Sequence, residues 1–340
     1  MSFNRRRKMR KESHELQWLE TVSQRKQLTE EQRRALQRSQ KGFLGEQQMD
    51  QLAEMFLSGK VLVIDDITLR YQNTVVQIDK LLIIGNTIYV IDVKFYQGNY
   101  ILQNNSWICG GKFLTTNILE QLRKAMRVIV NIFREQQIDL EVKGVLAFLN
   151  PKSSIQIKDQ IPETVLSFNE IPAWLLGLNQ QTANEYYYDC QSVLFQYRID
   201  NYRSQRTLSI EEEKQLQKGI RCSRCHQLKV VDKRHTVRCD CGYVEPKETA
   251  YTRTICEFGV IFHDQDLKLK KLKEFFGEQV DEHYLKYILK RHFVSIKSTP
   301  KKKFGHQNKG IIFDYWFEDK IRYFKKLEKR IDWSTPILKN

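Results

Sequence analysis

Residues 75–94 read VVQIDKLLIIGNTIYVIDVK, and this stretch decides the expected fold. Two apolar runs, Val75–Ile84 and Thr87–Val93, have the length and the β-branched content of buried strands. Gly85 and Asn86 lie between them and both tolerate positive φ, so they predict a tight hairpin turn. The sequence therefore predicts two adjacent antiparallel strands.

Charged side chains stand at the open end of this hairpin. Asp92 and Lys94 alternate along one strand, so both point to the same face. Asp79 on the preceding strand can lie beside Asp92 across the pair. Two carboxylates this close are costly unless a positive charge compensates them, and Mg²⁺ or Mn²⁺ with oxygen ligands would do so. Lys94 could orient or deprotonate a water, or stabilise charge in a transition state.

Each part of this pattern also has an ordinary interpretation. Asp92 and Lys94 could be a solvated pair at the end of a strand, and Asp79 with Lys80 an edge-strand charge. A glutamate on a helix, an aspartate on a hairpin strand and an Asp-x-Lys triplet on the next strand follow one another along the chain. This order favours a catalytic site over isolated surface charges.

The flanking segments complete a mixed α/β pattern. Helical spacing over residues 42–58 precedes a strand-like run at Val61–Leu69. An amphipathic helix is expected over Asn117–Gln136, followed by a strand over Val142–Leu149. The order of helix, three strands, helix and strand predicts a mixed central sheet flanked by helices.

Two helical residues join the candidate site. Glu46 lies on the first helix and could hold a metal-bound water or a second metal. Gln121 lies on the later helix, and Lys124 and Arg127 follow at positions that could extend one polar stripe toward a phosphate. An exposed glutamine on an amphipathic helix is equally ordinary.

From Gly42 to about Trp174 the sequence resembles the nuclease-related domain (NERD) family of the PD-(D/E)XK nuclease superfamily. The resemblance is carried by Gly45-Glu46, Gln77-Ile78-Asp79, Ile91-Asp92-Val93-Lys94, Tyr96-Gln97-Gly98, a helix with Gln121 and a strand ending in Asn150. It implies a restriction-endonuclease-like core, metal-dependent cleavage of DNA, and site roles for Glu46, Asp79, Asp92, Lys94 and Gln121. This chain departs from the family pattern at Asp92, where Glu is usual, and at Asn117-Ile118, which replaces Asn-Pro.

A cysteine cluster predicts a second metal site. Its members form a C-x₂-C pair and a C-x-C pair, namely Cys222, Cys225, Cys239 and Cys241. Four thiolates suit structural Zn²⁺, and the segment resembles a zinc ribbon, whose second pair is normally C-x₂-C. His226 or His235 could replace one cysteine, and four free thiols are the ordinary alternative.

Charge is concentrated at the two ends of the chain. The net charge is +15; residues 1–41 hold 12 Lys and Arg against 5 Asp and Glu, and residues 265–340 hold 19 against 10. This distribution favours a near-neutral core held on DNA by basic flanks, although lysines often only solvate a surface.

The basic ends have their own expected structure. Residues 5–40 are expected to form a solvated helix, or to be partly disordered, with a helix restarting at a capping box near Thr29. Helices over Leu267–Phe276 and Val280–Phe293, basic Lys301–Lys303 and a strand-like Ile311–Phe317 follow the order of a winged helix. Ordinary helical packing with solvated lysines is as good an interpretation.

The sequence thus predicts five segments. They are a basic helical arm (1–41), a NERD-like nuclease domain (42–185), a helical linker (186–218), a zinc-ribbon-like module (219–250) and a basic α-rich C-terminal domain (251–340). No apolar run is long enough for a membrane span, and the odd cysteine count suits the cytoplasm. We expect a metal-dependent DNA nuclease that could pair as a homodimer. The alternatives are a non-catalytic DNA-binding protein or a scaffold for protein contacts.

Overall fold

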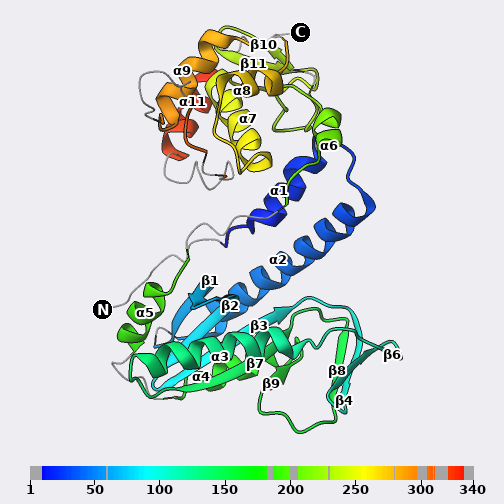
Figure 1. Cartoon of the computed structure of the whole chain (residues 1–340), viewed down its shortest axis with the longest axis vertical. Helices are drawn as coiled ribbons and strands as arrows, with labels where there is room; N and C mark the ends of the chain where they lie inside the picture. The colour runs from blue at the N-terminus through cyan, green and yellow to red at the C-terminus, as the bar shows by residue number, and fades with distance from the viewer. Residues whose placement is uncertain are drawn as a thin grey trace. The chain divides into compact units, whose positions relative to one another are not determined.

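The computed structural model describes residues 10–58, 60–181, 187–199, 206–228, 230–278, 280–296, 305–308, 310 and 321–332. The chain forms two compact units (Figure 1). Unit 1 comprises Met1–Arg10 and Arg38–Tyr202, and unit 2 comprises Lys11–Gln37 and Arg203–Asn340. Each unit is described by itself.

Unit 1 is built on a mixed sheet with the strand order β1-β2-β3-β7-β9. The strands are β1 (Leu62–Tyr71), β2 (Thr74–Ile84), β3 (Thr87–Lys94), β7 (Glu141–Phe148) and β9 (Thr164–Leu166). β1, β2 and β3 are antiparallel, whereas β3, β7 and β9 run parallel. The predicted hairpin is confirmed, because Gly85 has a φ of 55° and Ile84 pairs with Thr87.

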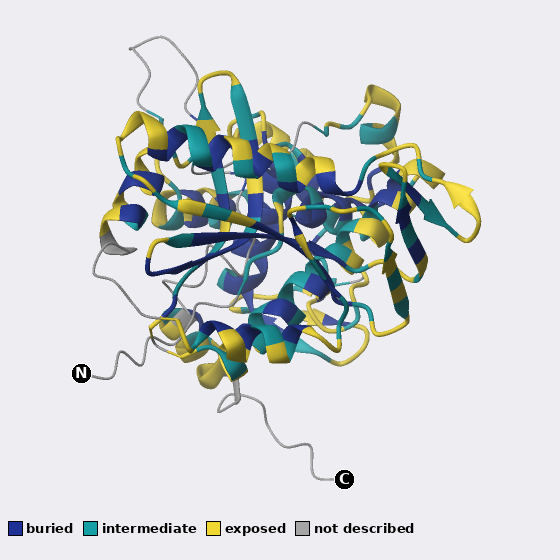
Figure 2. Ribbon diagram, turned by 90° about the horizontal axis from the view of Figure 1, so that it is seen from below, coloured by how far each residue is buried: buried dark blue, intermediate teal, exposed yellow. Residues whose placement is uncertain are grey.

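Helices cover both faces of this sheet (Figure 1). One face carries α3 (Leu119–Glu135), which packs against β2, β3 and β7. The other face packs against Met49 of α2 (Glu30–Phe56) and against α4 (Ile171–Leu178). The central strands β2, β3 and β7 are accordingly mostly buried, and Figure 2 shows the middle of the sheet in dark blue. The expected mixed sheet flanked by helices is confirmed.

A smaller sheet and one more helix complete unit 1. The sheet has the order β6-β5-β4-β8, with β4 (Gly98–Gln103), β5 (Ser106–Cys109), β6 (Lys112–Phe113) and β8 (Ser153–Ile157). Part of the expected helical, polar linker forms α5 (Tyr187–Gln196), and this helix buries Cys190, Val193 and Leu194 in the main core. Three apolar side chains at helical spacing explain why this segment packs rather than links.

Unit 2 combines helices with a small sheet. The elements are α1 (His14–Ser23), α6 (Ile210–Gln215), β10 (Val230–Asp232), β11 (Thr236–Cys239), β12 (Val244–Pro246), α7 (Lys247–Ile261), α8 (Leu269–Phe276), α9 (Glu282–His292) and α11 (Ile321–Asp332). The central helix is α7, whose residues are nearly all buried. The basic, α-rich character expected of the C-terminal region is confirmed.

The N-terminal segment differs in part from its expected form. Thr29 and Gln32 exchange two hydrogen bonds between their backbone N–H groups and side-chain oxygens, so the predicted capping box is confirmed. The expectation of a solvated helix is wrong for α1, because Trp18 is 1% exposed and Leu19 is fully buried. The Trp18 indole N–H donates to the carbonyl of Ile261 at 3.1 Å. Trp18, Leu19 and Val22 form an apolar face within unit 2.

Some expectations stay predictions. Lys301–Lys303 and Ile311–Phe317 lie outside the described residues, and so does the winged-helix arrangement that depends on them. The boundaries of the five functional segments also stay predictions. Within the part of the chain that the structure describes, no helix combines the length and hydropathy of a membrane span.

Gly45 lets α2 approach the end of β3 closely. A Cβ at this position would lie 2.9 Å from Cβ of Phe95 and 3.4 Å from Cγ1 of Val93. The same helix contains Gly42, where an added Cβ would meet nothing within 4 Å. The two glycines therefore differ only in their surroundings.

We predict opposite effects of alanine at these two glycines. Gly42→Ala should raise the free energy of unfolding by up to about 1 kcal/mol, because alanine favours a helix interior. Gly45→Ala should lower it by about 1–3 kcal/mol through overpacking. Urea denaturation of both variants measures the difference, and equal stabilisation by both would contradict the close packing of α2.

Candidate active site and metal centres

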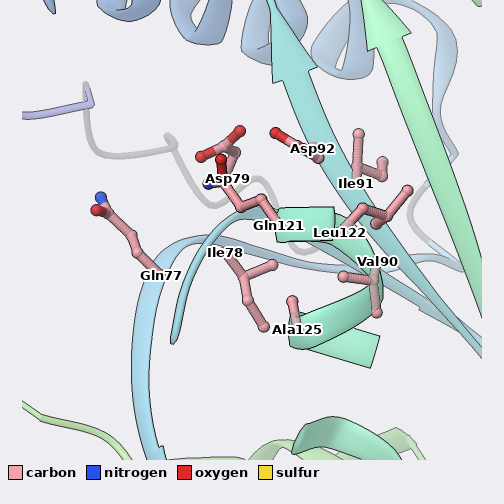
Figure 3. Close-up of a pocket in the computed structure, with 9 residues that line it drawn as sticks. All are labelled: Gln77, Ile78, Asp79, Val90, Ile91, Asp92, Gln121, Leu122 and Ala125. Atoms are coloured by element: carbon pink, nitrogen blue, oxygen red, sulfur yellow. The ribbon is translucent and has the colours of Figure 1, made fainter. Parts of the chain in front are cut away.

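Strand pairing brings the two aspartates together. Lys80 of β2 pairs with Ile91 of β3, so Asp79 and Asp92 are the next residues along the two antiparallel strands. The backbone N–H of Val93 donates to Oδ2 of Asp79 at 2.8 Å. The carboxyl groups of Asp79 and Asp92 lie together in Figure 3. The arrangement expected from the hairpin is present.

Lys94 and Gln121 meet the same carboxylates. Lys94 Nζ donates to Oδ1 of Asp92 at 2.7 Å and to Oε1 of Gln121 at 3.2 Å. Lys94 follows Asp92 by two residues on a strand, and Gln121 comes from the first turn of α3 on that face. One ammonium group therefore joins the sheet to the helix that covers it.

A pocket opens at this junction. It is small and open to solvent, with room for about one water-sized ligand. The residues that line it are Gln77, Ile78, Asp79, Val90, Ile91, Asp92, Gln121, Leu122 and Ala125. Its polar end is acidic and its floor is apolar, as Figure 3 shows.

Burial makes these acids hard to ionise. The pKa of Asp79 is raised to about 7, mainly by burial and secondly by the charge of the nearby Asp92. Burial also raises the pKa of Asp92, even though Lys94 acts in the opposite direction. For Lys94, burial lowers the pKa, but Asp92 outweighs it, so the pKa is raised and the amine keeps its proton.

The donor atoms fit a hard divalent cation. Oδ2 of Asp92 is buried and has no hydrogen-bond partner among the described residues, which leaves an acceptor that a cation would satisfy. Mg²⁺ commonly takes one or two protein carboxylates and completes its shell with water and phosphate. Asp79 and Asp92 supply that number of carboxylates.

Glu46 approaches the site from the other side of the sheet. It lies on α2, on the face opposite α3, and its Oε2 accepts from Arg10 Nη1 at 3.0 Å. The pKa of Glu46 is raised to about 8, mainly by burial and secondly by the charge of Asp79. The positive charge of Arg10 acts in the opposite direction and lowers this pKa. Glu46 is thus electrostatically linked to Asp79, but it does not line the pocket.

Sequence reasoning missed three charged residues around Glu46. Arg10 and Lys80 both bind the carboxylate of Asp50, at 2.8 and 2.6 Å. Asp50 follows Glu46 by four residues, so helical spacing could have placed both on one face. Nothing local in the sequence points to Arg10, because its partners lie at least 36 residues away.

The polar stripe expected after Gln121 is exposed on α3. Lys124 and Arg127 are both exposed, and Arg127 pairs with Glu120 at 2.9 Å. A role of these two residues in binding phosphate stays a prediction.

The four clustered cysteines meet in unit 2. The Sγ atoms of Cys222, Cys225, Cys239 and Cys241 all lie within 4.8 Å of one another. Cys222 and Cys241 are 3.8 Å apart, and Cys225 and Cys239 are 3.5 Å apart. Zn–S bonds of 2.3 Å in a tetrahedron separate sulfur atoms by about 3.8 Å, so this cluster could hold a zinc ion.

The unusual C-x-C spacing is accommodated by a turn. Gly242 has a φ of 82°, and its N–H donates to the carbonyl of Cys239 at 2.9 Å. No histidine is needed to complete the set. Among the described residues, these cysteines are the one group of three or more Cys, His, Asp or Glu whose donor atoms come this close together.

Basic side chains gather on two helices of unit 2. Exposed residues of α11 include Arg322, Lys325, Lys326, Lys329 and Arg330, and α9 adds Lys286, Lys290 and Arg291. The Arg291 guanidinium lies over the rings of Tyr287 and Tyr323, at 5.6 and 5.4 Å. Cations interleaved with aromatic rings are typical of surfaces that bind nucleic acids.

Comparison with known proteins agrees with the geometry. Residues 41–149 match the family model NERD, nuclease-related domain. This range contains all five candidate site residues of unit 1, and the resemblance inferred from the motifs is confirmed. No curated protein and no solved structure matches the chain.

The acidic pocket should make stability depend on pH. A carboxyl group whose pKa rises on folding stabilises the fold while protonated, and this contribution is lost as pH rises through the folded value. Because the pKa of Asp79 rises from 3.8 to about 7 on folding, the wild type in a chelator should lose stability between about pH 4 and 7 relative to Asp79→Asn, by roughly 1–3 kcal/mol after allowance for solvent screening. Thermal melts across this range measure the effect, and Mg²⁺ should reduce it. Parallel stability curves for both proteins would count against the buried charges.

The cysteine cluster should hold one zinc ion per chain. Cys222→Ser should lose the bound zinc and loosen β10–β12, because a small metal-bound segment has little core of its own. Metal analysis by mass spectrometry, with limited proteolysis, measures both effects. Cys256→Ser is the matched control: this buried thiol lies outside the cluster, so the variant should keep its zinc. Zinc retained by Cys222→Ser would contradict a four-cysteine site.

Proposed function

We propose that unit 1 is a divalent-metal-dependent nuclease that hydrolyses phosphodiester bonds of DNA. The strongest support is that Asp79, Asp92 and Gln121 line one pocket and that Lys94 donates to both Asp92 and Gln121. They do so inside the residues that match a nuclease-related domain. The carboxylates supply oxygen ligands, and the lysine supplies a fixed positive charge.

Asp79 and Asp92 would hold Mg²⁺ or Mn²⁺. When bound, such a cation withdraws charge from a phosphoryl oxygen and lowers the pKa of water. The hydrogen bond from Val93 N–H fixes one oxygen of Asp79, and Lys94 fixes one oxygen of Asp92. Each aspartate therefore enters the site already oriented, which reduces the entropy lost when a ligand binds.

Lys94 and Gln121 would act on the phosphate and the attacking water. Lys94 keeps its proton beside Asp92, so its role is to place a positive charge where negative charge grows in the transition state. Gln121 accepts from Lys94 and orients the ammonium group. Glu46 would bind a water or a second cation at the edge of the site.

The basic helices of unit 2 would supply affinity for DNA. The exposed cations of α9 and α11 are suited to phosphate contacts. The cysteine cluster would hold structural Zn²⁺ that orders the segment preceding α7. None of the seven cysteines forms a disulfide, which suits a reducing cytoplasm. A homodimer would allow both strands to be cut.

The second candidate function is DNA binding without turnover. It is supported by the basic surface of unit 2, which requires no catalysis at the acidic pocket. Both functions predict salt-dependent affinity for DNA. They differ in whether a divalent cation leads to cleavage.

Cleavage should depend on Asp92 and Lys94. With Mn²⁺ or Mg²⁺ and plasmid or linear DNA, Asp92→Ala and Lys94→Ala should each lower the cleavage rate by about 10²-fold or more, because charge stabilisation is lost. Affinity for DNA, measured by fluorescence anisotropy, should stay within about threefold, because these residues are buried.

Asp139→Asn is the matched control, since it neutralises an exposed aspartate of the same unit. It should cleave like the wild type. Identical products from the wild type and from Asp92→Ala would indicate a contaminating nuclease. Absence of cleavage by the wild type with every divalent cation, together with tight DNA binding, would favour the second function.

A further inference from the structure

Arg10 holds a buried ionic network beside the candidate active site. Its guanidinium donates to both carboxylate oxygens of Asp50, at 2.8 and 3.1 Å, and to Oε2 of Glu46 at 3.0 Å. A fourth hydrogen bond, of 2.8 Å, reaches the backbone carbonyl of Asp79. The Arg10 side chain is 2% exposed. Because guanidinium has five N–H donors, nearly all of its capacity is used inside the protein.

These contacts join one covering helix to the sheet. Glu46 and Asp50 are one turn apart on α2, which covers the face opposite α3, and like charges at this spacing repel. The carbonyl of Asp79 belongs to β2, next to the point where the pairing with β3 ends and the pocket lies. Arg10 therefore ties the helix that carries Glu46 to the strand that carries Asp79.

The network orders the site without filling it. Arg10 bonds the backbone of Asp79 and not its carboxylate, and it uses one of the two oxygens of Glu46. Oδ2 of Asp92 has no partner among the described residues. Asp50 also pairs with Lys80, whereas Arg10 provides the only ion pair of Glu46 within the described part of the chain. Loss of Arg10 would thus affect Glu46 most.

We propose that Arg10 is a positioning residue of the nuclease site, which holds the Glu46 carboxylate beside Asp79 so that the cation site is complete. This inference rests on the proposed function. It extends the site beyond the matched residues 41–149, into the basic N-terminal segment. An arginine in such a segment would ordinarily contact DNA phosphates, but the burial of Arg10 keeps it away from them.

The test compares cation binding and catalysis in wild type, Arg10→Gln and Arg10→Lys. Mn²⁺ affinity is measured by calorimetry without DNA, and kcat and KM are measured on linear DNA. Arg10→Gln should weaken Mn²⁺ binding and lower kcat, each by about 10-fold or more, with KM unchanged. Arg10→Lys should recover part of both, because lysine restores the charge but not the bidentate geometry. It also provides a folded comparison if Arg10→Gln is unstable.

Arg123→Gln is the matched control. Arg123 forms another bidentate ion pair of unit 1, with two hydrogen bonds of 2.7 and 3.1 Å to the carboxylate of Glu163. Its replacement should change neither Mn²⁺ affinity nor kcat. In a Glu46→Gln background, Arg10→Gln should add less than about a twofold further loss, because its effect passes through Glu46.

Three outcomes would overturn the role of Arg10. They are wild-type Mn²⁺ affinity in both Arg10 variants, tighter Mn²⁺ binding in Arg10→Gln, and a rise in KM with kcat unchanged, which would indicate a phosphate contact. Wild-type protein that binds no Mn²⁺ and cleaves no DNA would instead overturn the proposed function. The wild-type measurements alone therefore show whether the proposed nuclease function is wrong or only the proposed role of Arg10.

Discussion

The candidate site of unit 1 depends on two carboxylates that lie opposite each other at the end of a buried hairpin. Asp79 and Asp92 repel each other, and burial raises the pKa of both. Lys94 offsets only part of this, since it is a single ammonium group bonded to Asp92. The fold therefore carries an unfavourable cluster of acids that a divalent cation would relieve. Clusters of this kind are common where stability is given up for function.

The rest of unit 1 holds this cluster rigidly. The central strands beneath it are mostly buried, and amphipathic helices pack their apolar sides on both faces of the sheet. Groups from opposite faces can meet only at the end of the sheet, and there Glu46 approaches Asp79 while Gln121 reaches Lys94. Gly45 permits the close approach of α2, and Arg10 bonds α2 to β2. Backbone and ionic contacts thus hold side chains from three elements in one place.

The sequence predicted those features that depend on local pattern. Alternation along the hairpin placed Asp79, Asp92 and Lys94 together, and the cysteine spacing identified the cluster in unit 2. It could not predict contacts between distant residues. Arg10 has no local pattern that reveals its partners, and the burial of Trp18 depends on α7, more than 200 residues later. The linker expected after residue 186 contains α5, which packs in the main core. Its apolar residues have helical spacing in the sequence, but the polar composition of the segment favoured the prediction of a linker.

The two units would use metals of different chemistry for different purposes. Thiolates are soft ligands that hold zinc tightly, and four of them leave no open position for a substrate. Carboxylates are hard ligands that hold Mg²⁺ or Mn²⁺ loosely and leave positions for water and phosphate. Unit 1 has a complete apolar core on both faces of its sheet, so a cation at its carboxylates would be free to exchange. In unit 2 the segment around the cysteines forms a three-stranded sheet of short strands, so a zinc ion held there would add to the stability of a segment with few apolar contacts of its own.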